Sequence, residues 1–124
     1  MEGHRPFPAR LEDFLGVAVR HLDEHWRVFA ILVEDEMASS RGGSGESQHR
    51  PMLREVYKAA EKLCALGVRE GALREADSAL FPSLLVGAIS GLFRHQLFVG
   101  RGEPLVSHVP ALARYFLTGA GARR

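Results

Sequence analysis

The sequence has little cysteine and no excess of charge, and each shortage excludes a class of protein. Cys64 is the single cysteine among 124 residues, which excludes an internal disulfide and a cysteine-based metal cluster. The 16 Lys and Arg against 15 Asp and Glu give a formal charge of +1. A nucleic-acid-binding domain usually carries a basic excess, so we do not expect one here. Reduced cysteine is usual inside cells, and we expect a cytoplasmic protein.

Long apolar runs are missing as well. The longest stretch without a charged residue covers 78–93, which is sixteen residues. A membrane-spanning helix needs about 20 mostly apolar residues, so this stretch predicts a buried helix and no membrane partner. No apolar run of the signal-peptide kind follows Met1. The 46% hydrophobic content is too high for a disordered chain, and the length suits a single domain over 1–124.

Apolar residues recur at intervals of three and four almost throughout the chain, as they do in amphipathic helices. One stripe covers 11–22 and a second covers 26–37. The phase slips between them, at 23–25, which predicts a kink or a break. The segment 39–49 is rich in Gly and Ser and has no periodicity, so it predicts a flexible loop.

Three more helices are predicted after this loop. The first begins near Pro51 and ends at Gly67 or Gly71. The second runs from about residue 78, where Asp77 or Ser78 can cap it, to about residue 99. The last begins near residue 104, and Pro110 should kink it or reset its start. No segment alternates as a strand would, so the predicted fold is all-α, a bundle of five to six helices.

The predicted helix over 78–99 is apolar around most of its circumference. Ser83, Ser90 and Arg94 share one narrow polar arc, and the remainder requires cover on more than one side. A short link over 100–103 makes this helix and the last one an antiparallel pair. Pairing with a second copy would complete an intersubunit four-helix bundle about a twofold axis. The predicted homodimer interface consists of Leu84, Leu85, Gly87, Ala88, Gly91, Leu92, His95, Leu112, Tyr115 and Phe116.

Three segments resemble the C-terminal domain of TetR-family transcriptional regulators. They read GVREGALR over 67–74, LLVGAISGLFRH over 84–95 and LARYFLTG over 112–119. The stretch 21–37 resembles that family's break between the fifth and sixth helices of the full protein. The resemblance covers most of the chain and rests on the order and length of helices more than on any motif.

The resemblance implies a domain that senses a small apolar or amphipathic effector and forms a homodimer. It implies no catalysis and no cofactor. In that family a basic helix-turn-helix module reads DNA, and these residues contain none, so DNA is expected as a partner only through an absent N-terminal domain. The effector pocket is expected among the first three helices and the inner side of the fourth. The candidate ligand-binding residues are Phe14, His21, Trp26, Phe29, Val33, Leu53, Tyr57 and Cys64.

Two alternatives stay open at this point. His21 and His25 stand four apart on one helix and can reach one metal ion, which is the basis of a metal-dependent helical enzyme. No third ligand is evident near them, and we expect no metal. The other alternative is a purely structural dimerisation bundle without a pocket, because aromatic residues at helical spacing are usually core.

Overall fold

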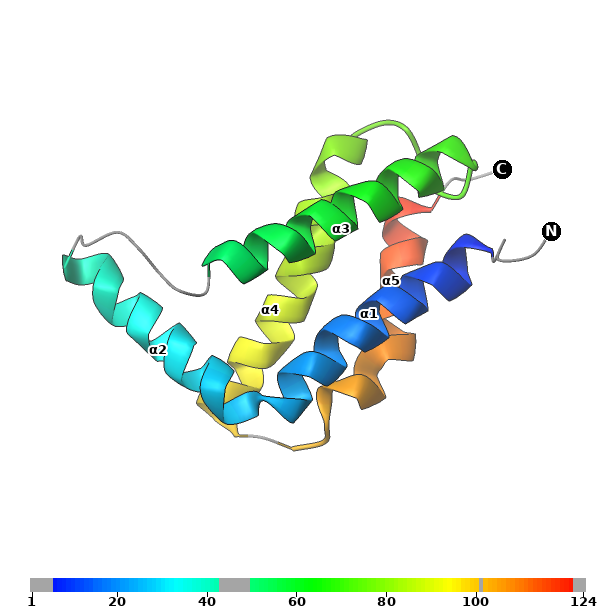
Figure 1. The fold of residues 1–124 in the computed structure, drawn as a ribbon. Helices are drawn as coiled ribbons and strands as arrows, with labels where there is room; N and C mark the ends of the chain where they lie inside the picture. The colour runs from blue at the N-terminus through cyan, green and yellow to red at the C-terminus, as the bar shows by residue number, and fades with distance from the viewer. Residues whose placement is uncertain (1–5, 43–49, 101, 122–124) are drawn as a thin grey trace.

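The structure, a computed structural model, describes residues 6–42, 50–100 and 102–121, without the side chains of 36–42, 50–53 and 120. These ranges form five α-helices and two short 3-10 helices (Figure 1). In order they are α1 (Phe7–Glu24), α2 (Trp26–Gly42), α3 (Arg50–Arg69), η1 (Ser78–Leu80), α4 (Phe81–Val99), η2 (Leu105–His108) and α5 (Val109–Ala120). The predicted all-α class is confirmed.

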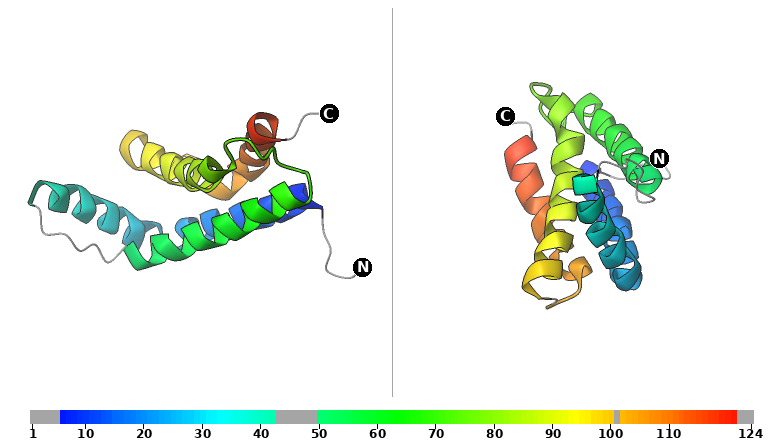
Figure 2. Two further views of the ribbon diagram at one scale, coloured as in Figure 1. Left: turned by 90° about the horizontal axis from the view of Figure 1, so that it is seen from above. Right: turned by 90° about the vertical axis from the view of Figure 1, so that its left-hand side faces the viewer.

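The helices pack in two layers. Helices α1 and α3 run antiparallel in one layer, and α4 and α5 lie over them in the other (Figure 2). Helix α5 packs mainly on α1, and α4 packs mainly on α3. The far end of α2 lies away from both layers (Figure 1). Helices α4 and α5 run in opposite directions, as the short link between them predicts.

The predicted break between the first two helices is confirmed. Helix α1 ends at Glu24, and His25 leaves the helical conformation with φ −120° and ψ 36° before α2 begins at Trp26. The break matches the slip in apolar phase. A straight continuation would turn the stripe of α2 away from the core that buries Phe29 and Val33.

One predicted helix end is wrong, and for another helix the later of its two predicted ends is confirmed. Helix α2 continues to Gly42, so residues 39–42 are helical and not part of a loop. Serine and arginine cost little in a helix, and the Gly-rich run begins only after them. Residues 43–49 lie outside the described ranges. Helix α3 passes through Gly67 and ends at Arg69, just before Gly71, whose φ of +82° is a left-handed value that glycine adopts without strain.

Gly67 has a packing role instead of a terminating one. A Cβ atom at this position would lie 2.7 Å from Cε1 of Phe7 and 2.8 Å from Cδ1 of Leu73. Both neighbouring side chains are buried. The missing side chain therefore lets α3 approach the start of α1 closely.

The starts of the last two helices follow their prolines. Pro82 and Pro110 each lie in the first turn of an α-helix, where the missing N–H group costs no hydrogen bond. Pro110 thus resets the start of the last helix, leaving η2 ahead of it. Asp77 precedes η1 with a φ of 62°, and its side chain makes no capping hydrogen bond, so the predicted cap is not formed by Asp77.

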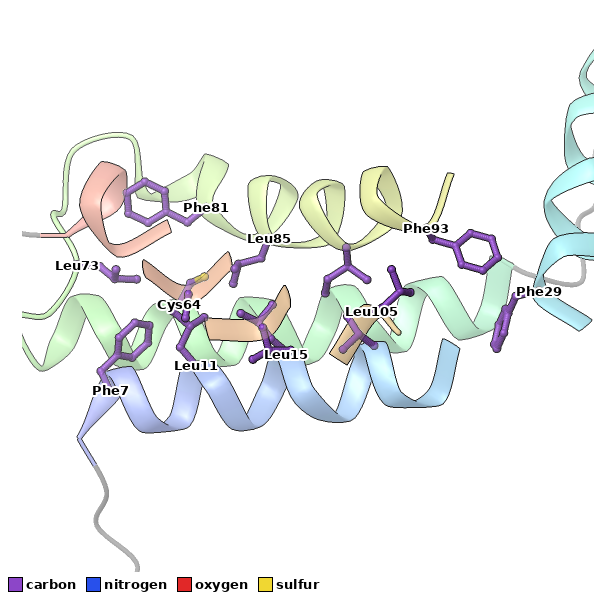
Figure 3. Close-up of a cluster of buried hydrophobic side chains, with 14 of the residues drawn as sticks. Phe7, Leu11, Leu15, Phe29, Cys64, Leu73, Phe81, Leu85, Phe93 and Leu105 are labelled. Carbon is purple, nitrogen blue, oxygen red and sulfur yellow. The ribbon is translucent and has the colours of Figure 1, made fainter. Parts of the chain in front are cut away.

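The core lies between the two layers and is made by residues from every helix (Figure 3). Its most deeply buried members are Leu11, Leu15, Val19, Leu85 and Leu105. At the other end of the cluster, Phe93 of α4 and Phe29 of α2 face one another (Figure 3). None of the helices in the described ranges has the length and apolarity that crossing a membrane requires.

Candidate functional site: an exposed helix pair and a small cavity

The outer side of α4 and α5 exposes apolar side chains. We name as the α4–α5 face the exposed residues Leu80, Leu84, Gly87, Gly91, His95, Phe98 and Tyr115. On it, Leu84 is 56% exposed, Phe98 60% and Tyr115 69%. These large apolar side chains lie on the same face and are more than half exposed. Together they form a patch of the kind that marks an interaction surface.

Nine of the ten residues predicted for the homodimer interface lie exposed or half-buried on these two helices. Leu84, Gly87, Gly91, His95 and Tyr115 are exposed, and Ala88, Leu92, Leu112 and Phe116 are half-buried. The prediction is wrong for Leu85. It is 1% exposed and points into the chain's own core (Figure 3). Two residues along a helix from Gly87, it lies on nearly the opposite side of α4.

The two exposed glycines of α4 have open space above them. A Cβ atom built on Gly87 or Gly91 meets no other atom within 4 Å. These two glycines are therefore not part of the packing between helices within the single chain. Within the single chain their lack of a side chain serves no contact, and it costs helix stability of about 1 kcal/mol each.

A groove of about 410 Å³ opens between α4 and α5. Its apolar lining comes from Leu15, Phe81, Leu84, Leu85, Ala88, Leu112, Tyr115, Phe116 and Gly119. Phe81 and Phe116 form an edge-to-face pair at 5.9 Å between ring centroids. The Arg114 guanidinium stands 5.0 Å over the Tyr115 ring. The groove is thus continuous with the α4–α5 face and apolar like it.

The predicted ligand-binding residues do not share one cavity. Phe29 and Val33 line a cavity of about 40 Å³ between α2 and α4. Cys64 lines a different one, of about 490 Å³, between the end of α3 and the start of α4. Phe14 and Tyr57 are half-buried, and the side chain of Leu53 lies outside the described part of the chain.

Two further candidates pack around the small cavity. The Trp26 ring lies 4.5 Å from that of Phe93, which lines the cavity, measured between centroids. The exposed His21 ring lies edge-on to Phe29 at 5.4 Å. Of these two residues, only Trp26 is in contact with a residue of α4.

Ser90 and Arg94 complete that cavity and were missed as site residues. The sequence assigns them to the polar arc of α4, yet both are half-buried and line the cavity together with Leu22, Phe29, Val33 and Phe93. The signal was present. An arginine that directly follows the sixteen uncharged residues 78–93 in a mostly apolar helix needs a reason, and contact with another helix provides it.

Cys64 is inert by environment. Burial raises the pKa of its thiol from 9.0 to about 11, so the thiol is neutral under ordinary conditions. Only the thiolate form of a cysteine acts as a nucleophile or a metal ligand, and burial disfavours that form of Cys64.

His21 and His25 lie close together, but the described residues provide no third metal ligand beside them. The ring centroids of His21 and His25 are 4.7 Å apart. Among the described residues, no group of three or more His, Cys, Asp or Glu side chains could hold a metal ion. Two imidazoles without a third ligand make a weak site, since zinc centres use at least three protein ligands.

The end of α1 is tied to the start of η2 by hydrogen bonds. The Asp23 carboxylate accepts from the backbone N–H groups of Leu105 and Val106, at 2.9 and 3.0 Å. A second contact holds the link between α4 and η2. The buried Gln96 of α4 donates a hydrogen bond from Nε2 to the backbone carbonyl of Glu103, at 2.9 Å. These bonds join the end of α1, the end of α4 and the start of η2.

No known protein family matches this chain, and neither curated proteins nor solved structures provide a match.

Proposed function

We propose that this chain is the effector-sensing and homodimerisation domain of a TetR-like transcriptional regulator that acts in the cytoplasm. Its second copy covers the α4–α5 face, and a small molecule binds between α2 and α4. DNA is contacted by a separate helix-turn-helix domain. The order of the elements supports this proposal, since the break at His25, the turn at Gly71 and the closing helix pair stand where the resemblance places them.

The observation that carries the proposal is the exposed α4–α5 face. Leu84 and Tyr115 are more than half exposed on adjacent helices, beside a groove of about 410 Å³. Burying apolar surface stabilises by about 25 cal/mol per Å², so a second copy that covers this face gains from each of these side chains. Two antiparallel helices from each copy form a four-helix bundle about a twofold axis.

Helix α4 connects the two proposed activities. Phe93 lies against the small cavity, while Gly91 and His95 lie on the opposite, exposed side of the helix. A ligand that shifts α4 must therefore change the surface offered to the second copy. In thermodynamic terms the ligand selects one of two arrangements, and an effector that weakens DNA binding is itself bound less well by the DNA-bound form.

Light scattering of the purified chain tests this function. A dimer that dissociates on dilution is the expected result, and a well-folded monomer at high micromolar concentration would refute it. A thermal-shift screen on the same sample tests sensing, since a ligand stabilises the fold in proportion to its occupancy. A dimer that no small molecule stabilises would favour the purely structural bundle instead.

A further inference from the structure

The exposed residues of α4 are spaced symmetrically about Gly91. Leu84 and Phe98 are each seven positions away from it, and Gly87 and His95 are each four positions away. All five residues are exposed. At 100° per residue they share an arc of about 80°, and Gly91 lies at the middle of that arc. The positions of this stripe therefore coincide with themselves when the helix is turned end over end about Gly91.

A stripe with this symmetry fits an antiparallel copy of itself. A twofold axis through Gly91 places residue 84 of one copy opposite residue 98 of the other, and residue 87 opposite residue 95. The His95 side chain then lies opposite Gly87, where added atoms meet no atom of the chain within 4 Å. On the axis Gly91 meets its own copy, so that no Cβ atom keeps the two backbones apart.

The groove between α4 and α5 lies on one side of Gly91 only. Its lining from α4 comes from the first half of that helix and includes Leu84, and Tyr115 is among its residues from α5. Phe98, which is 60% exposed, lies in the second half of α4. The twofold axis brings Phe98 of the second copy to Leu84 and thus to the groove. Each copy supplies both an exposed aromatic ring and an apolar groove that can receive one.

The charges of α4 permit this pairing. Residues 81–99 contain one formally charged side chain, Arg94, and it lines the cavity on the side of α2. A twofold axis can bring a charge close to its own copy, and like charges in contact across an interface cost several kcal/mol. The uncharged stripe meets no such penalty. Among partners of unknown charge, a second copy is the one that this stripe is certain to match.

The exposed area favours a register that uses both ends of α4. Phe98 and Tyr115 are 60% and 69% exposed, which corresponds to about 200–300 Å² for two aromatic side chains. A stable interface takes about 800 Å² from each partner, so these two rings supply about a third of it. An interface that left out Phe98 would lose a large share of this apolar area.

We propose that two copies of this chain pair through antiparallel α4 helices with the twofold axis at Gly91, and that Phe98 of each copy fills the α4–α5 groove of the other. The groove is complete only when the second copy contributes this ring. The proposal gives the residue pairs of the dimer in the proposed function and so rests on that function.

Disulfide crosslinking of the double variant Gly87→Cys/His95→Cys tests the register. A Cys64→Ala background leaves only the new thiols to react. Positions 87 and 95 are about 12 Å apart along one helix, and a disulfide joins Cα atoms at most about 7 Å apart, so a link between them must join two copies. After mild oxidation, mass spectrometry of the digested dimer should find peptides linked 87 to 95. Gly16→Cys, at an equally open glycine of α1, should stay unlinked.

A charge exchange tests the outer pair without oxidation. Leu84→Glu alone and Phe98→Lys alone should each weaken the dimer, because each buries an unpaired charge. In the double variant Leu84→Glu/Phe98→Lys, the antiparallel register sets each carboxylate opposite an ammonium group of the second copy. Its dimer dissociation constant should be at least about tenfold below that of either single variant. A parallel pairing would set like charges together and leave the double variant monomeric.

Two results would overturn the inference and leave the proposed function in place. One is a dimer whose disulfides join 87 to 87 or 95 to 95, or that forms none. The other is a dimeric parent chain whose charge-exchange variant dimerises no better than the single variants. A parent chain that is monomeric by light scattering overturns both proposals. If circular dichroism shows that the cysteine variant is unfolded, the charge exchange decides, since Leu84 and Phe98 are both more than half exposed in the single chain.

Discussion

Asp23 fixes the start of η2 by accepting a hydrogen bond from the backbone of Leu105. One oxygen of its carboxylate accepts from the N–H group of Leu105 at 2.9 Å, and the other accepts from the next residue at 3.0 Å. Asp23 and Leu105 are 82 positions apart in the sequence. The carboxylate thus caps η2 from another helix and fixes the α1–α2 break against the segment that leads into α5. Leu105 itself is fully buried, so the bond closes one end of the core.

Removing this carboxylate should destabilise the fold. Asp23→Ala is expected to lower the free energy of unfolding by about 2 kcal/mol, because two N–H groups lose a charged acceptor. Asp23→Asn should lose roughly half as much, since the amide oxygen can replace one bond only. Urea denaturation measures both, and amide hydrogen exchange should speed up at Leu105 and Val106. The exposed Glu12→Ala is the control on the same helix, and equal stability of Asp23→Ala and the parent would contradict the prediction.

A charge on the α4–α5 face should dissociate the proposed dimer. Leu84→Glu and Tyr115→Glu each place a carboxylate where a second copy would remove water, and an unpaired buried charge costs several kcal/mol. Both positions are exposed in the single chain, so the fold itself should survive. Light scattering should show monomers for these two variants. Val17→Glu, at a 67% exposed position of α1, should stay dimeric. Loss of the dimer in Val17→Glu as well would argue against this face.

The glycines of α4 offer a subtler test of the same interface. In a free chain, alanine at an open helical glycine stabilises by about 0.5–1 kcal/mol. Gly16→Ala on α1 should show this gain, because a Cβ atom there meets nothing within 4 Å. Gly91→Ala has equally open space in the single chain, but a closely packed second copy would clash with the added methyl group. Its dimer dissociation constant should rise about tenfold. A Gly91→Ala variant that stabilises the protein and leaves that constant unchanged would sink the prediction.

The Cys64 thiol should resist alkylation and impose a pH dependence on stability. Its pKa is about 11 in the folded chain against 9.0 for the free group, so the unfolded chain loses this proton first. Stability is therefore full below about pH 9 and falls as pH rises from 9 toward 11, by on the order of 2 kcal/mol. Denaturant midpoints across this range measure the fall, and Cys64→Ala should flatten it. Iodoacetamide at neutral pH should react quickly only after denaturation, and fast labelling of the folded chain would contradict the assigned burial.

The helices and most of their limits could be predicted because they depend on local features. Apolar spacing determines the faces, prolines mark the first turns of α4 and α5, and the phase slip at His25 marks the break. The errors arose where a local signal had a tertiary explanation. Gly67 looked like a terminator and instead gives room to Phe7. Serine and glycine composition alone did not tell the last turn of α2 from a loop.

The site depended far more on tertiary structure. Periodicity assigns a residue to an arc of its helix, but it does not say which arc meets another helix. Leu85 and Leu84 are adjacent leucines with opposite surroundings, one in the core and one exposed. Ser90 and Arg94 appeared to be a polar arc and proved to line a cavity against Phe29. Only the position of α2 beside the second half of α4 decides this.

The single cysteine and the balanced charge still exclude what they excluded at first, and the structure adds where the cysteine lies. By itself the sequence determined an all-α chain without disulfides and without a basic surface, because composition and spacing act within each helix. Only the tertiary structure decided that Cys64 lies buried, that Asp23 bonds to residues more than eighty positions away, and that the apolar surplus of α4 and α5 faces outward. Those outcomes depend on which helix covers which face, and that is decided by apolar contacts between residues far apart in the sequence, which no local pattern records.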